Sequence, residues 1–225
     1  IHEQLDHHAQ RFEVTKLQDI ELRHIVKERV LRPKSAAAKD AIATATARLG
    51  QEHEKILPGL LGSGEVDLAY LRDVYPFHPA LIETLIDVTA LMQRERSALR
   101  LLYELLVIHY PTLPLGQFLP VGSAFDAIFP RGGVEASKKV EVLQDIHRQY
   151  YERLVPAMKG MQAADPEFDD KRLHALDQLV KTVLLAEVSP RLKGKGLTIE
   201  RLVQLNSADV EGETYRGRLR VSATD

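Results

Sequence analysis

Residues 75–102 read YPFHPALIETLIDVTALMQRERSALRLL, and this stretch decides the fold class. Pro76 and Pro79 fix their own φ angles and push the residues before them toward extended backbone, so YPFHP predicts a rigid connector. Beyond the connector, apolar residues recur with helical spacing, which predicts one helix over residues 80–92 and another over about 95–109. Two consecutive helices that begin at a proline connector indicate a mainly α protein.

Helical patterns continue on both sides of this stretch, whereas strand-like alternation is confined to residues 12–17 and 217–221. The amphipathic spacing, the helix-starting residues and the positions of proline and glycine predict seven further helices. They are expected at residues 19–31, 35–57, 67–74, 124–128, 136–161, 171–187 and 198–205. A loop-rich region at 111–135 separates an earlier from a later group, and a basic loop is expected at 190–196.

The composition is that of an ordinary globular chain. The 225 residues are 44% hydrophobic and 28% charged, with a net charge of -2, which argues against a basic surface covering the whole molecule. Cysteine is absent, so disulfides and thiolate metal sites are excluded. No apolar run approaches the roughly 20 residues that cross a bilayer. We therefore expect a cytoplasmic protein without a membrane partner, and the start at Ile1 suggests a piece of a longer chain.

Two segments carry a family resemblance. The run RFEVTKL at residues 11–17, followed by residues 19–30, resembles the point where the chain leaves an AAA+ core. The combination YPFHP…QRxRxALRLL resembles the large P-loop ATPases of bacterial phage-defence islands, of the BREX and phage-growth-limitation types. The segments at 120–122 and 195–198 are similar to the same group. The resemblance implies a full-length protein that binds ATP and Mg, hydrolyses ATP, and acts with other phage-defence proteins. A homo-oligomer is one arrangement that the resemblance allows.

The resemblance also implies a domain organisation. Residues 1–17 would be a remnant of the ATPase core, residues 18–110 its helical lid, and residues 111–225 a second helical module, for which a winged-helix-like arrangement is one reading. The sequence contains no G-x-x-x-x-G-K-[ST] loop to hold phosphate and magnesium. We therefore expect the nucleotide-binding core to precede Ile1, and this piece to be inactive and without a cofactor when alone.

Three arginines of the decisive stretch are the candidate nucleotide sensors. Arg96, in the run Arg-x-Ala-Leu, resembles the sensor-2 arginine of AAA+ lids, and Arg94 and Arg100 lie close to it in the sequence. A guanidinium is always charged and pairs with phosphate oxygens in a bidentate manner, which suits a γ-phosphate sensor. The alternative is a solvated arginine paired with Glu95 or Glu104. Arg11 resembles an arginine that acts in trans on a neighbouring subunit's nucleotide, with an ordinary surface arginine as the alternative.

A basic region near the end of the chain offers a different function. Arg191, Lys193 and Lys195 could contact DNA phosphates, or they could belong to an exposed turn that uses charge against mispairing. The functions that compete with nucleotide sensing are therefore a helical scaffold for partner proteins and a DNA-binding adaptor. The histidines near Ile1 lack an H-E-x-x-H pattern, and we expect no metal site.

Overall fold

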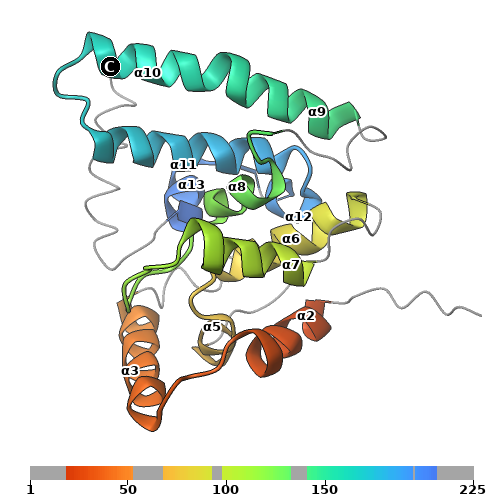
Figure 1. Cartoon of the computed structure of the whole chain (residues 1–225), viewed down its shortest axis with the longest axis vertical. Helices are drawn as coiled ribbons and strands as arrows, with labels where there is room; N and C mark the ends of the chain where they lie inside the picture. Colours follow the sequence, from red (N-terminus) through yellow and green to blue (C-terminus); the bar gives the residue numbers. More distant parts are fainter. Residues whose placement is uncertain (1–18, 53–67, 93–97, 133–140, 195, 207–225) are drawn as a thin grey trace, which may run out of the picture.

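The computed structural model describes residues 19–52, 68–92, 98–132, 141–194 and 196–206 (Figure 1). Within these ranges the chain is helical and forms no strand, apart from one isolated parallel bridge between Phe77 and Leu119. The mainly α prediction is confirmed. The strands expected at 12–17 and 217–221 lie outside the described residues, so the winged-helix-like arrangement stays a prediction.

The first group of helices lies at one end of the molecule (Figure 1). Helix α2 (Asp19–Ile25) continues into the π-helical turn η1 (Val26–Val30), and the chain then passes Pro33 to α3 (Ala36–Glu52). Pro33 stops the first helix as predicted, because proline has no N–H to continue the ladder. Helix α5 (Leu68–Val74) packs against α2, η1 and α3.

The YPFHP connector is held in place by backbone hydrogen bonds to a distant segment. The His78 N–H donates to the Leu119 carbonyl over 3.0 Å, and the Leu119 N–H donates to the Pro76 carbonyl over 2.7 Å. His78 Nδ1 also accepts from the Ala80 N–H at 3.2 Å and so caps α6 (Pro79–Leu91). Phe77 is fully buried beneath the helix. The connector is therefore tied to the segment around Leu119, and its histidine is a helix cap.

The central and later helices complete the fold. Helix α7 (Ala98–Glu104) continues into η2 (Leu105–His109), and the segment at 118–120 leads to η3 (Val121–Ser123) and α8 (Ala124–Ile128). Helices α9 (Glu141–Arg148), η5 (Gln149–Leu154) and α10 (Val155–Ala164) follow one another along one edge of the molecule, beside α11 (Asp170–Ala186) (Figure 1). The chain then forms α12 (Pro190–Lys193) and α13 (Ile199–Asn206).

One expectation about this region was wrong. Residues 190–193 were expected to be part of a basic loop, but they form α12. Pro190 occupies the first turn, where a missing N–H costs nothing, and the Ser189 hydroxyl accepts from the Leu192 N–H at 3.4 Å. Both are helix-start signals, and they outweigh the loop-like glycines that follow.

A single apolar cluster joins the two groups of helices. It extends from Leu22 to Leu205 and includes fully buried side chains such as Leu81, Phe77 and Phe125. The cluster crosses the segment around residue 110 without interruption among the described residues. The proposed division there into a lid and a second module stays a prediction.

Candidate functional site

The predicted sensor helix is anchored on one side and open on the other. Ala98, Leu101 and Leu102 of α7 are buried in the core, whereas Arg100 is exposed. The Arg100 Nε donates to Glu104 Oε1 at 2.9 Å, four residues further along the same helix. This is one of the two pairings considered for a solvated arginine. Arg94, Arg96 and the trans-acting candidate Arg11 lie outside the described residues, so their roles stay predictions.

The outer surface of the same helical segment is apolar. Tyr103, Val107 and Ile108 are 59%, 50% and 64% exposed, although their side chains are large and hydrophobic. Tyr103 and Val107 are four residues apart and therefore share a face of the helix. Apolar side chains gathered on one helix surface are typical of a contact surface for another protein or domain.

The residues proposed to contact DNA near the end of the chain have acidic partners. Asp87 of α6 accepts from the Ser189 hydroxyl at 2.7 Å and from the Arg191 N–H at 3.2 Å, and its other oxygen lies 3.2 Å from Arg191 Nε. Lys193 Nζ lies 3.1 Å from Glu187 Oε2. We call the first set, Asp87, Ser189 and Arg191, the α6–α12 clamp. Lys195 lies outside the described residues, and DNA contact through this region stays a prediction.

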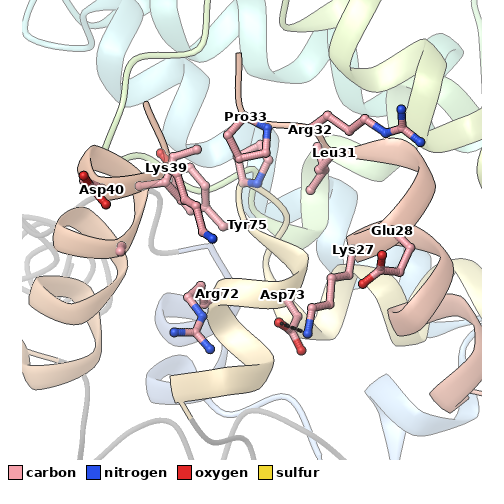
Figure 2. Close-up of a pocket in the computed structure, with 13 residues that line it drawn as sticks. Lys27, Glu28, Leu31, Arg32, Pro33, Lys39, Asp40, Arg72, Asp73 and Tyr75 are labelled. Carbon is pink, nitrogen blue, oxygen red and sulfur yellow. Dashed lines mark ion pairs between the residues drawn. The ribbon is translucent and has the colours of Figure 1, made fainter. Parts of the chain in front are cut away.

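An open groove lies at the other end of the molecule, between η1, α3 and α5 (Figure 2). Its volume is about 580 Å³, within the range of ligand-binding clefts. The floor is largely apolar and includes Leu31, Pro33, Ile42, Tyr75 and Pro76. The walls carry charged side chains, which distinguishes this groove from an ordinary gap between packed helices.

The charges around the groove are unevenly compensated. The Asp73 carboxylate is paired with two cations, Arg23 at 2.8 Å and Lys27 at 3.2 Å. In contrast, Arg32, Lys39 and Arg72 line the groove, are exposed, and form no ion pair with another described residue. Figure 2 shows Lys39 extending from α3 toward α5, and Arg72 extending from α5 toward α3.

Sequence reasoning missed this groove, although a signal was present. Residues 23–39 contain six Lys or Arg and one Glu, a net charge of +5 in a chain whose total is -2. Such a local run is informative even when the overall charge is not. What the sequence could not give is Arg72, which reaches the groove only because α5 packs against α3.

A buried ionic cluster connects α8, η5 and α11. Lys181, only 5% exposed, lies 2.8 Å from Asp126 Oδ1 and 2.7 Å from Asp177 Oδ2. The Tyr150 hydroxyl donates to the other oxygen of Asp177. Burial alone would lower the pKa of Lys181, but the two carboxylates outweigh burial and raise it. Burial, reinforced by the bond to Asp177, raises the pKa of Tyr150. The cluster is internally satisfied, so its evident role is to hold these helices together.

Across the described ranges, no three His, Cys, Asp or Glu side chains are arranged to hold a metal ion. In the same ranges, no helix combines the length and the apolar composition that crossing a bilayer requires.

The described residues form a helical domain, and the sequence contains no phosphate-binding loop. Residues 23–219 match the family model described as the second domain of the BREX system ATPase PglY protein. Because the match covers most of the chain, the chain belongs to this family, and the resemblance read from YPFHP…QRxRxALRLL is confirmed. No solved structure matches the chain.

Proposed function

We propose that this domain senses the nucleotide held by the ATPase core of the full-length protein and passes the signal to the helices that follow. The proposal depends on two observations taken together, namely the family of the chain and the absence of one motif from its sequence. The chain belongs to an ATPase family, but its sequence has no phosphate-binding loop. Its contribution to an ATP cycle would therefore come through contacts with a nucleotide held elsewhere, with Mg bound at that distant site.

The exposed side of α7 that carries Arg100 is suited to such a contact. The helix is fixed by its buried side, so a charge on its outer side has a defined position. The Arg100 side chain is 62% exposed, although the Glu104 side chain with which it pairs is only 16% exposed. The guanidinium can therefore reach a polyphosphate that approaches from solvent. Arg96 precedes Arg100 by four residues in the sequence, the spacing of one helical face.

The packing around α6 offers a route for coupling. Helix α6 contacts both α7 and α12, and the α6–α12 clamp joins residues about a hundred positions apart in sequence. A shift of α7 against the nucleotide would displace α6 and, through the clamp, α12. In this proposal the ATPase core, other phage-defence proteins and further copies of the protein are the partners.

The test is ATP hydrolysis by the full-length protein carrying Arg96→Ala or Arg100→Ala. Loss of one preorganised charge that stabilises a transition state lowers kcat by about a hundredfold or more. Arg148→Ala is the matched control, because Arg148 is also an exposed helical arginine paired with a carboxylate of its own helix. Unchanged hydrolysis and unchanged nucleotide affinity in both the Arg96 and the Arg100 variant would refute nucleotide sensing.

A second candidate function is a protein-interaction scaffold without nucleotide linkage. It is favoured by the exposed apolar surface of Tyr103, Val107 and Ile108. Val107→Glu combined with Ile108→Glu would then abolish assembly with a defence partner, measured by size-exclusion chromatography, while ATP hydrolysis stays normal. The nucleotide-sensing proposal requires instead that the arginine variants alter hydrolysis.

A further inference from the structure

We propose that the groove between η1, α3 and α5 binds the phosphate groups of a nucleic-acid backbone through Arg32, Lys39 and Arg72. None of these cations belongs to α7, so this inference goes beyond the proposed nucleotide sensing and does not depend on it. It also assigns phosphate contact to a different end of the molecule from the basic residues near α12.

The first observation in support is the distribution of ion pairs around the groove. Asp73 is already neutralised by Arg23 and Lys27, so it leaves no attraction for a third cation. Arg32, Lys39 and Arg72 line one groove and have no acidic partner among the described residues. Figure 2 shows Lys39 and Arg72 extending into the space between α3 and α5, whereas the Arg32 guanidinium points away from both. Like charges on one surface repel each other, and a bound polyanion would relieve that repulsion.

Besides Asp73, two further carboxylates line the groove, and they limit what it can bind. Glu28 and Asp40 are exposed, and Figure 2 places Asp40 at the outer edge of the groove, away from Arg72. The groove is therefore not uniformly basic, and a ligand must reach the cations between these two carboxylates. A strand with regularly spaced charges can do so by crossing the groove from one wall to the other.

The shape favours a strand over a small anion. Arg32 lies just after η1, Lys39 in α3 and Arg72 in α5. All three side chains are exposed. An enclosed phosphate site would require buried donors that converge on one point. Spread over an open groove, the same charges fit a backbone that presents one phosphate after another. Guanidinium groups, which supply two of the three contacts, pair with phosphate oxygens in a bidentate manner.

The floor of the groove indicates binding without base recognition. Among the described residues, Tyr75 is the one aromatic residue that lines it, but its ring packs edge-on against Phe118 at 5.6 Å and its hydroxyl accepts from the Gly116 N–H at 2.7 Å. Its ring is therefore engaged in the core and is not a stacking platform for a base. The remaining floor is aliphatic or proline, so contact would be electrostatic and independent of sequence.

The test is DNA binding by the full-length protein, measured by fluorescence anisotropy with a labelled duplex and with the corresponding single strand. Each lost phosphate contact lowers the slope of log K against log salt by about 0.9 for a duplex and 0.7 for a single strand. The triple variant Arg32→Ala, Lys39→Ala, Arg72→Ala should therefore have a slope smaller in magnitude than the wild-type slope, by about 2.7 for the duplex and about 2.1 for the single strand. For a duplex this is roughly a fortyfold change in affinity between about 50 and 200 mM salt.

Two further variants separate charge from structural damage. Arg32→Lys with Arg72→Lys keeps the charges and should keep the salt slope. Arg153→Ala, Lys171→Ala, Arg172→Ala removes the same number and kind of exposed cations at the opposite end of the molecule (Figure 1) and should leave the slope unchanged. The proposal is overturned if the groove variant keeps the wild-type slope, or loses no more slope than the control variant. It is equally overturned if the groove variant binds DNA normally but no longer binds an acidic partner protein.

Discussion

Gly122 lies directly against the main chain of Gln178. A Cβ placed on Gly122 would be 2.4 Å from the Gln178 carbonyl oxygen, which is too close for any real contact. The absence of a side chain at Gly122 is what lets η3 approach α11, and around the same point the Ser123 hydroxyl donates to Gln178 Oε1 at 3.4 Å. This contact joins η3, which follows the segment that hydrogen-bonds to YPFHP, to α11.

Gly122→Ala should destabilise the domain for this reason. The added methyl meets backbone rather than a flexible side chain, so η3 and α11 must separate, and overpacking of this kind costs about 1–3 kcal/mol or more. Gly160→Ala is the matched control, since Gly160 lies within α10 and has no atom within 4 Å of its would-be Cβ. That change should stabilise the helix by about 0.5–1 kcal/mol. Urea denaturation measures both, and equal effects of the two substitutions would contradict the packing argument.

The α6–α12 clamp predicts a local loss of stability in Asp87→Ala. The substitution removes the acceptor for Ser189 and Arg191 and leaves a half-buried guanidinium without its carboxylate. We expect a loss of about 1–3 kcal/mol, the range for an unsatisfied, largely buried polar group. Hydrogen exchange should accelerate in α12 before it does so in α9.

Asp145→Ala is the control for the clamp. Asp145 forms an ion pair with Arg148 at the surface of α9, and such pairs contribute between zero and about 1 kcal/mol. If the Asp87 and Asp145 variants lost equal stability, or if exchange in α12 stayed at the wild-type rate, the clamp would not be a structural link.

The helices were predictable from the sequence because their signals are local. Ala124–Ile128 was expected and found at the same residues, and Pro33 ended the first helix as proline should. Helix α12 was not predicted because the basic residues and glycines of 190–196 are typical of a loop, whereas its start signals are confined to Ser189 and Pro190. Its main anchor, Asp87, is about a hundred residues away in sequence and could not be inferred from local pattern.

Each candidate site likewise combines residues that the sequence pattern indicates with residues that only tertiary packing brings there. The basic run at 23–39 is visible in the sequence, but its convergence with Arg72 depends on how α5 packs. Lys181 is a similar case, because it lies on a helix read for its apolar face, while its partner Asp126 is in α8. Local periodicity gives the helices, whereas the charges that meet between them follow from tertiary contacts.

Lys181→Met should be strongly destabilising. Methionine has a similar length, so the space is filled, but Asp126 and Asp177 lose the cation that compensates them. Removing one partner of a buried ion pair costs about 3–5 kcal/mol. The triple variant Asp126→Asn, Asp177→Asn, Lys181→Met removes all three charges and should recover part of the loss. Thermal and urea unfolding measure the difference between the two variants. If Lys181→Met alone were as stable as the wild type, Lys181 would not be compensating the charges of Asp126 and Asp177.

The same cluster predicts how stability responds to alkaline pH. The folded state raises the pKa of Tyr150 and of Lys181 above their ordinary values of 10.0 and 10.5, and burial also raises the pKa of Tyr110. A group whose pKa is higher in the folded state holds its proton more tightly there than in the unfolded chain. Its contribution is therefore complete below about pH 10 and is lost as pH rises above that value, when the unfolded chain gives up protons first.

The free energy of unfolding should accordingly be flat from pH 8 to near pH 10 and then fall steeply, which urea titrations at successive pH values can measure. Tyr150→Phe removes one of the titrating groups, so its decline above pH 10 should be shallower than that of the wild type. At neutral pH the same variant should lose only about 1 kcal/mol, the net value of one hydrogen bond, because Asp177 keeps its ion pair with Lys181. Parallel curves for the two proteins above pH 10 would mean that the Tyr150 hydroxyl does not contribute to alkaline unfolding.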